Sequence, residues 1–197
     1  MANYYAIAAV SAALREMLAD ARPQPEFSAA QIELLQVPDF QKPKPMDEGI
    51  SIVLYRVTVS AAPRNLYPRL DPDGRRRLPP LPVDLHFMFT PWGRSAAKQQ
   101  RLLGWLLRTL EDTPTLNAEL LNHYGGPETI FDETESVTMI FEPLSLQDLT
   151  NVWDILKPNA QLSVAYVARM VYLETILEEP TGERVQTREF QMAKVIR

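Results

Sequence analysis

The sequence predicts an α+β domain in which a mixed, mostly antiparallel β-sheet is flanked by α-helices and carries long Pro-rich loops. Two neighbouring segments lead to this prediction. The run from Leu162 to Leu177 contains no Gly or Pro and has apolar side chains at odd and even positions, which is typical of a strand covered on both faces. The segment before it has apolar residues at helical spacing, which are Leu146, Leu149, Val152, Trp153 and Leu156. We therefore expect a central strand with helices on both sides of the sheet.

The N-terminal part predicts a helix, a strand and a loop. Asn3 can cap a helix that Pro23 and Pro25 end, and the many small residues in this helix allow another backbone to approach closely. We expect a strand from Phe27 to Val37 and a stiff, Pro-rich loop over 38–49. The apolar stripe expected for the helix comprises Tyr4, Ile7, Leu14, Met17, Leu18 and Ala21.

A hairpin with an unusually long tip is expected next. The segments from Ile50 to Ala62 and from Val83 to Phe89 are rich in β-branched and aromatic residues, and each predicts a strand. Between them, 63–82 is a proline-bearing excursion around a turn signal at 71–74. Tips of this length in compact domains are usually functional or disordered, so the excursion is a candidate interaction element.

The middle of the chain predicts two helices and a strand. Ser95 can cap a helix over 96–112, in which Gly104 is expected to permit close packing, because a mid-helix glycine otherwise costs about 1 kcal/mol. A short helix over 116–124 and a strand over 137–141 follow.

Capping signals also frame the helix that precedes the central strand. Ser145 and Asp148 fit a capping box, and Pro158 ends the helix. Beyond the central strand, 183–197 is expected to be a C-terminal strand or arm, with strand character from Val185 to Ile196. Phe190, Met192 and Ile196 fall on one side of it. We expect one domain over 1–197, with 38–49 and 63–82 as loops or arms.

Composition excludes several classes of protein. The net charge is −5, which argues against general nucleic-acid binding, because that needs a basic surface. There is no cysteine, so neither a disulfide framework nor thiolate chemistry is expected. We find no signal peptide and no apolar run of the roughly 20 residues that a membrane helix needs.

Candidate catalytic and metal-binding residues are few. His86 and His123 are the only histidines, and neither has a carboxylate at the spacing of a metal site. Asp84 and His86 share one face of a predicted strand, but no nucleophile motif accompanies them, so we interpret the pair as structural or as polar contacts at an interface. The sequence gives no support for catalysis, a metal or a cofactor.

The sharpest charge feature is Arg75-Arg76-Arg77 at the hairpin tip. One interpretation is a solubilising loop tip. The other is a basic finger that docks on an acidic protein surface, since arginine favours bidentate contacts with carboxylates. Nucleic acid is a weaker third interpretation because the whole chain is acidic.

Three stretches carry a resemblance to a known family. They are the N-terminal helix YYAIAAVSAALREML, the segment LPVDLHFMFTPWG with the later DTPTLN, and the capped helix and strand SLQDLTNVWDILKPNAQLSVAYVARMVYLET. Together they resemble the cap, or tail-terminator, family of phage-tail-like extracellular contractile injection systems. The resemblance covers nearly the whole chain, from Asn3 to Thr175.

This resemblance implies a structural cap and not an enzyme. It implies a homohexameric ring that ends the inner tube and the contractile sheath, fixes particle length and holds the sheath to the tube. The implied partners are the chain itself, the inner tube protein and the sheath protein, without nucleic acid or membrane. Assembly is implied in the cytoplasm, before the particle is released. Arg75, Arg76 and Arg77 with Phe190, Met192 and Ile196 are the expected contact residues.

Other functions stay open at this stage. The chain could be a tail-completion protein of a true phage or of another contractile machine, or a small enzyme or ligand-binding domain. The terminal strand 185–196 could pair with a neighbouring subunit or could complete the domain's own sheet.

Overall fold

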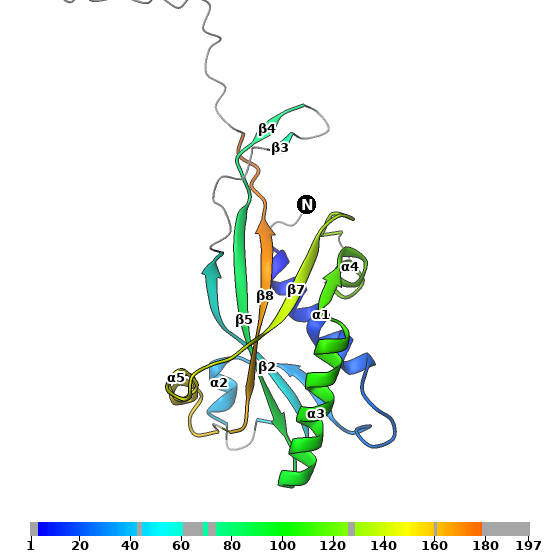
Figure 1. The fold of residues 1–197 in the computed structure, drawn as a ribbon, viewed down its shortest axis with the longest axis vertical. Coiled ribbons are helices and arrows are strands. Elements are labelled where there is room, and N and C mark those ends of the chain that lie inside the picture. Colours follow the sequence, from blue (N-terminus) through cyan, green and yellow to red (C-terminus); the bar gives the residue numbers. More distant parts are fainter. Residues whose placement is uncertain are drawn as a thin grey trace, which may run out of the picture.

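The computed structural model describes residues 4–42, 45–60, 69–70, 74–125, 129–159 and 161–178. These residues form a six-stranded sheet of order β1-β2-β5-β8-β7-β6 with helices on both faces (Figure 1). Only the β1–β2 pair is parallel, so the predicted mixed, mostly antiparallel α+β fold is confirmed. The strands are β1 Gln31–Leu34, β2 Gly49–Val59, β5 Leu81–Trp92, β6 Thr115–Asn117, β7 Ser136–Glu142 and β8 Val164–Leu173.

The two central strands are β5 and β8, and β8 lies within the segment 162–177 that was predicted as the central strand. They pair antiparallel over most of their length, for example Phe87 with Tyr166 and Phe89 with Val164. Every residue of β5 after Leu81 is buried, because helices or neighbouring side chains cover both of its faces. β5 therefore belongs to the core along nearly its whole length, whereas β8 leaves Arg169 and Met170 exposed.

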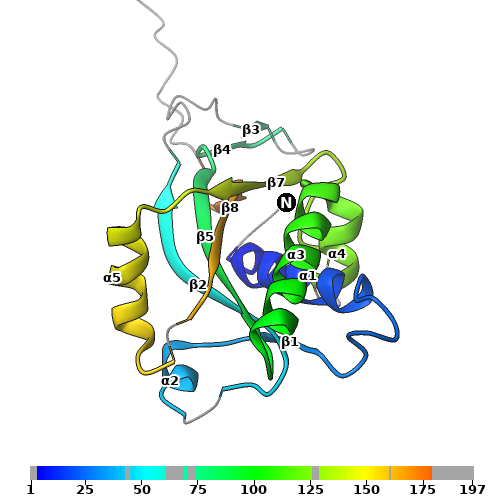
Figure 2. The same cartoon turned by 60° about the horizontal axis from the view of Figure 1, so that its bottom comes forward.

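Three helices cover one face, which we call the inner face (Figure 2). They are α1 Ala6–Asp20, α3 Ala96–Asp112 and α4 Ala118–Gly125. A Cβ added at Gly125 would lie 3.0 Å from the Cβ of Ala9, so the small residues of α1 do allow close packing against α4. The buried side chains of α1 are Ala6, Ala9, Val10, Ala13, Leu14, Met17 and Leu18.

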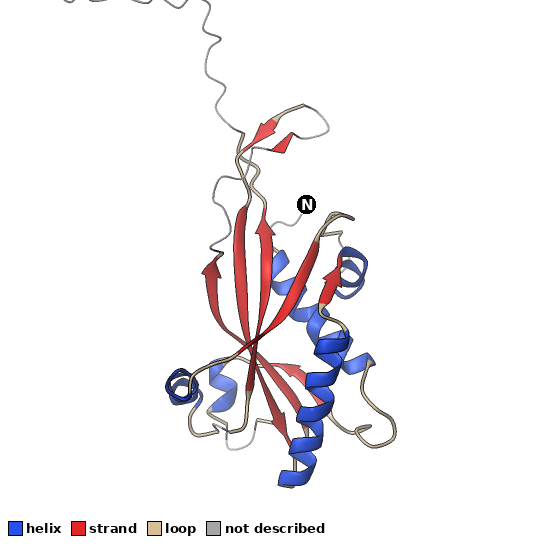
Figure 3. Cartoon of the chain, viewed as in Figure 1, coloured by secondary structure: helices blue, strands red, loops and turns tan. Residues whose placement is uncertain are grey.

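The opposite face, here the outer face, is covered over only part of its area. Helices α2 Val37–Phe40 and α5 Leu146–Leu156 pack there on a second apolar cluster (Figure 3). That cluster comprises Phe40, Met46, Val53, Met88, Trp92, Leu156 and Ala165. Higher on the same face, polar side chains of β2, β5 and β7 replace the apolar ones.

The predicted helix caps are confirmed for α3 and α5. The hydroxyl oxygen of Ser95 accepts a hydrogen bond from the backbone N–H of Lys98 (3.3 Å), and that of Ser145 accepts one from Asp148 (3.1 Å). Leu144 and Leu149 both pack on the outer-face cluster, as a hydrophobic staple requires. Leu146, predicted to be on the buried stripe of α5, is instead 76% exposed, because the helix lies at the rim of the sheet.

Several predictions about the N-terminal half were wrong. Helix α1 begins at Ala6 with Tyr5 at the N-cap, and the predicted cap Asn3 lies outside the described residues. Tyr4 is 74% exposed because it precedes the helix and so cannot join its stripe. The strand predicted over 27–37 is only Gln31–Leu34, because β1 pairs only with the start of β2, over Gly49 to Ile52.

Two predictions in the middle of the chain were also wrong. Nothing lies within 4 Å of a Cβ added at Gly104, and the residue is exposed, so it does not serve close packing. The helix predicted over 116–124 begins at Ala118. Thr115–Asn117 form β6 instead, because they pair with the start of β7 and bury Leu116 in the core.

Candidate interaction surfaces

A narrow arm projects beyond the upper end of the sheet (Figure 1). It consists of β3 Arg69–Leu70, β4 Arg76–Arg77 and the segment 174–178 that follows β8. The strands β3 and β4 pair antiparallel, with Leu70 opposite Arg76. The arm thus continues the two central strands of the sheet, since β4 leads into β5 and 174–178 leaves β8.

The basic segment predicted as a docking finger is bound to its own chain at one side of this arm. The side chain of Arg75 forms an ion pair with Glu178 (3.1 Å), and that of Arg77 donates to the carbonyl of Thr175 (3.4 Å). The backbone N–H of Leu78 donates to the carbonyl of Leu177 (3.1 Å). The arginines therefore hold the segment that leads toward the C-terminus, a role that the sequence did not indicate.

Large apolar side chains of the arm are exposed. Ile176 is 86% exposed, Leu70 68% and Leu177 61%, and Leu81 at the base is 47% exposed. Scattered exposed leucines are normal on a protein surface, but contiguous apolar patches mark interaction sites. Here they share one thin projection with Arg75–Arg77, so the arm has the composition of a binding element.

The other residues predicted at the interface are Phe190, Met192 and Ile196. They lie outside the described residues, as does the whole predicted strand 185–196. The contact role of the arginines and of this strand therefore stays a prediction.

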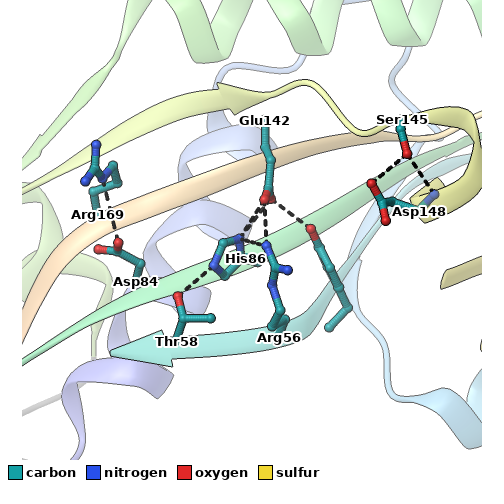
Figure 4. A network of polar contacts seen from close by, with 9 residues as sticks. Arg56, Thr58, Asp84, His86, Glu142, Ser145, Asp148 and Arg169 are labelled. Carbon is teal, nitrogen blue, oxygen red and sulfur yellow. Dashed lines mark hydrogen bonds and ion pairs between the residues drawn. The ribbon is translucent and has the colours of Figure 1, made fainter. Parts of the chain in front are cut away.

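A polar cluster on the outer face ties three strands together (Figure 4). The carboxylate of Glu142 on β7 reaches His86 Nδ1 on β5 (2.9 Å) and Arg56 on β2 (2.8 Å). It also accepts a hydrogen bond from the hydroxyl of Tyr55 (2.8 Å). The intervening strand β8 presents the small Ala165 opposite Glu142, which leaves room for the carboxylate to cross it. We call this cluster the Glu142 clamp.

The clamp also fixes the imidazole of His86, which is 7% exposed. The second ring nitrogen, Nε2, lies 3.0 Å from the hydroxyl of Thr58. Nδ1–H donating to Glu142 and Nε2 accepting from Thr58 satisfies both nitrogens. Burial and the hydrogen bond to Glu142 raise the pKa of the Tyr55 hydroxyl, which stays a neutral donor.

The order of hydroxyl, imidazole and carboxylate in the clamp is also that of hydrolase triads. In a triad, however, the carboxylate orients the imidazole and stabilises the imidazolium that forms during the reaction. The carboxylate of Glu142 is already paired with Arg56, so that stabilisation is weakened. The geometry therefore favours a clamp that holds β2, β5 and β7 in place.

Asp84 and His86 share the outer face, as predicted, but each has its own partners. Asp84 lies where the register of β5 and β8 shifts, and it accepts a hydrogen bond from the backbone N–H of Met170 (2.9 Å). Met170 has a φ of 61° there, a left-handed conformation that costs energy for a side chain of this kind. The carboxylate of Asp84 stabilises this bulge and also lies 3.7 Å from Arg169. The pair is structural, with two separate tasks.

A groove of about 460 Å³ runs along the outer face between β7 and the end of β8. Its lining includes Thr138 and Ile140 on β7 and Arg169 and Met170 on β8. A turn over 132–135 forms its rim, and we call this the acidic turn. The sequence did not indicate this groove, because it arises where the helices of the outer face stop short of the upper part of the sheet.

The acidic turn is held by its own hydrogen bonds. The backbone N–H of Asp132 donates to Glu135 (2.7 Å), and the carboxylate of Asp132 accepts from the N–H and hydroxyl of Thr134. Asn122 on α4 anchors the preceding residues by accepting from the N–H groups of Ile130 and Phe131. The turn is therefore a fixed feature, and the charge of Glu133 faces solvent on it.

The described residues contain no group of three or more His, Cys, Asp or Glu side chains that could hold a metal ion. Among the same residues, no helix has both the length and the apolar character needed to cross a membrane.

Comparison with known proteins gives a consistent result. The Pvc16 N-terminal domain family model matches residues 9–187. A sheath/tube terminator of an extracellular contractile injection system, PVC, in the extended state has a similar structure, with a TM-score of 0.61 and 19% identity over 96% of this chain. The tube-terminating cap of the anti-feeding prophage gives a TM-score of 0.57 and 18% identity over 94% of this chain. This chain spans 64% and 60% of those two chains, and no curated protein matches it.

Proposed function

The chain belongs to the Pvc16 N-terminal domain family, and from this premise we propose that it is a structural cap that ends the inner tube and the contractile sheath of a phage-tail-like injection particle. The observation that carries the proposal is the family match over 9–187, which includes every strand of the sheet. Similarity in fold to a sheath/tube terminator and to a tube-terminating cap supports it.

The proposed cap acts as a ring, and we propose a homohexamer. Tube and sheath subunits add through repeated interfaces, so growth stops when a ring fits one end and offers no template for the next layer. A head-to-tail interface between identical subunits closes into such a ring when its rotation permits. Ending growth in this way would also fix the length of the particle.

The proposed role is non-enzymatic, with the tube protein and the sheath protein as partners and with neither nucleic acid nor membrane. The arrangement of the Glu142 clamp supports a structural role, because its carboxylate is held by Tyr55, Arg56 and His86. We propose that the protein assembles in the cytoplasm and leaves the cell as part of the particle.

Solution mass and tube binding test this proposal together. The purified protein is measured by native mass spectrometry and is then added to tubes and to sheathed particles assembled from their own subunits. We expect a discrete hexamer, or a ring that forms on the tube end, and an end to further elongation. A protein that binds neither tube ends nor sheath would overturn the proposal.

Two variants test the proposed contact residues. Replacing Arg75, Arg76 and Arg77 with Ser should leave the fold intact and weaken capping. Deleting 181–197 should give a folded protein that no longer retains the sheath, if the terminal strand pairs with a neighbour. An insoluble deletion variant would instead indicate that this strand completes the domain's own sheet.

A further inference from the structure

The arm carries apolar side chains that the described part of the chain leaves uncovered. Ile176, Leu70 and Leu177 are the most exposed of them, at 86%, 68% and 61%. Burying such side chains is favourable because it removes apolar surface from water, so a projection that exposes several of them is suited to binding another surface. The backbone hydrogen bond between Leu78 and Leu177 gives this projection a defined shape.

The groove between β7 and β8 has the matching composition. Ile140 and Met170 are 42% and 40% exposed there, and the acidic turn stands at its rim. Within the described part of the chain, Glu133 makes no hydrogen bond or ion pair. One carboxylate oxygen of Glu135, Oε1, is buried and has no donor among the described residues, although buried polar atoms are nearly always hydrogen-bonded.

Charge complements the apolar match. The arm presents Arg75–Arg77, and the groove presents the carboxylates of the acidic turn. Asp71 and Asp73 precede the arginines, so the positive charge is local to 75–77 and does not extend over the whole excursion. Arginine is well suited to such a contact, because its guanidinium binds carboxylates with two parallel hydrogen bonds.

The arm does not reach the groove of its own chain. Register holds it in line with β5 and β8, because Leu81 pairs with Leu173 at its base and Arg77 bridges to Glu178 beyond that. The groove lies back along β8, from Arg169 to Tyr172, and none of the described residues of the arm lines it. A second copy of the chain can therefore supply the occupant.

We propose that the arm of one copy of this chain docks in the β7–β8 groove of a second copy. Ile176 and Leu177 cover Ile140 and Met170, and Arg75–Arg77 face the acidic turn. The two surfaces are different parts of the molecule, so the contact is heterologous and can repeat around a closed ring. This inference rests on the proposed ring, and it names the residues that join its subunits.

Cysteine cross-linking tests the contact directly, because the chain contains no cysteine of its own. The variant with both Ile140→Cys and Ile176→Cys is treated with a short bis-maleimide. We expect a ladder of covalent oligomers that ends at the ring. Each single variant should stay uncross-linked, whereas an equal mixture of the two single variants should give covalent dimers only.

Charge reversal supplies an independent measurement. Arg75→Glu with Arg76→Glu should weaken association by about tenfold or more, because like charges then face each other. Adding Glu133→Arg should restore part of it, because this change reverses the exposed charge of the acidic turn and leaves Glu135 in its hydrogen bond with the N–H of Asp132. The matched control is Arg94→Glu, which reverses an exposed arginine beyond the far end of β5, outside both the arm and the groove; it should leave association unchanged.

The outcomes separate this inference from the proposed function. A discrete oligomer without the 140–176 ladder overturns the contact and leaves the ring in place. A ladder in a protein that binds neither tube nor sheath supports the contact and removes the proposed function. A protein that stays monomeric at high concentration and gives no ladder, or an arm that cross-links only to sheath or tube subunits, overturns the inference.

Discussion

Removing the carboxylate of Glu142 should destabilise the fold more than any change at an exposed acid. The carboxylate receives Tyr55, Arg56 and His86 from two other strands. Hydrogen bonds to charged groups are worth about 1.5–3 kcal/mol, and a buried donor left unpaired costs about 1–3 kcal/mol. Without Glu142, the half-exposed guanidinium of Arg56 can be hydrated, whereas the buried imidazole of His86 cannot reach water. We therefore expect Glu142→Ala to lower the free energy of unfolding by about 2–3 kcal/mol.

Urea unfolding followed by circular dichroism measures this loss. The slope of the transition should be unchanged and its midpoint lower, as expected for a loss of stability without a change in the folded surface. Glu142→Gln should cost less, because an amide oxygen still accepts one hydrogen bond. Glu33→Ala is the control: Glu33 is exposed on β1 and should change stability by less than about 0.5 kcal/mol. Equal midpoints for Glu142→Ala and Glu33→Ala would refute the clamp.

Three further predictions concern single sites. Gly104→Ala should stabilise the protein by about 1 kcal/mol, because the added methyl group lies in open space in mid-helix. Gly49→Ala should instead lower the free energy of unfolding by more than about 3 kcal/mol, because its Cβ would lie 1.9 Å from the carbonyl oxygen of Gln31. Thermal unfolding of both variants checks the pair. Ser145→Ala should cost about 1 kcal/mol by loss of the N-cap, and an unchanged melting temperature would contradict that role. Burial and a hydrogen bond to Glu111 raise the pKa of Tyr166. Its contribution to the free energy of unfolding is therefore complete below the ordinary tyrosine pKa and is lost as the pH rises through the raised pKa. In a series of unfolding measurements at alkaline pH, the stability of Tyr166→Phe should fall less steeply with pH than that of the unmodified protein.

Elements with strong local signals could be predicted from the sequence. Helix α3 spans the predicted 96–112 because Ser95 caps it and leucines recur on one side. The central strand was recognised because both of its faces are apolar, and most of its residues are buried or half-buried, with Arg169 and Met170 exposed. The strand β7 spans Ser136–Glu142, where a strand over 137–141 was predicted, and its residues alternate between buried and exposed. In these segments, local propensity and tertiary packing favour the same structure.

The remaining features depend on contacts between distant segments. β6 is a strand only because β7 lies beside it. The sequence of this short segment alone therefore led to the prediction that it begins the helix over 116–124. The Glu142 clamp joins Arg56, His86 and Glu142 across three strands. No pattern of spacing in the sequence indicates that these residues meet. The arginines at 75–77 were predicted as a charged feature of the hairpin tip, but the ion pair of Arg75 with Glu178 forms only because the start of β5 and the end of β8 lie side by side.

The attachment of the arm has a mechanical consequence. A pull on the arm is transmitted to the start of β5 and to the end of β8, and both strands lie along the direction of that pull (Figure 1). The hydrogen bonds between antiparallel strands run perpendicular to the strands. A pull along the strands therefore loads these hydrogen bonds in shear, all at the same time, and does not break them one after another. β5 and β8 also lie inside the sheet, between β2 and β7. Tension applied at this projection is therefore distributed over the whole core of the domain.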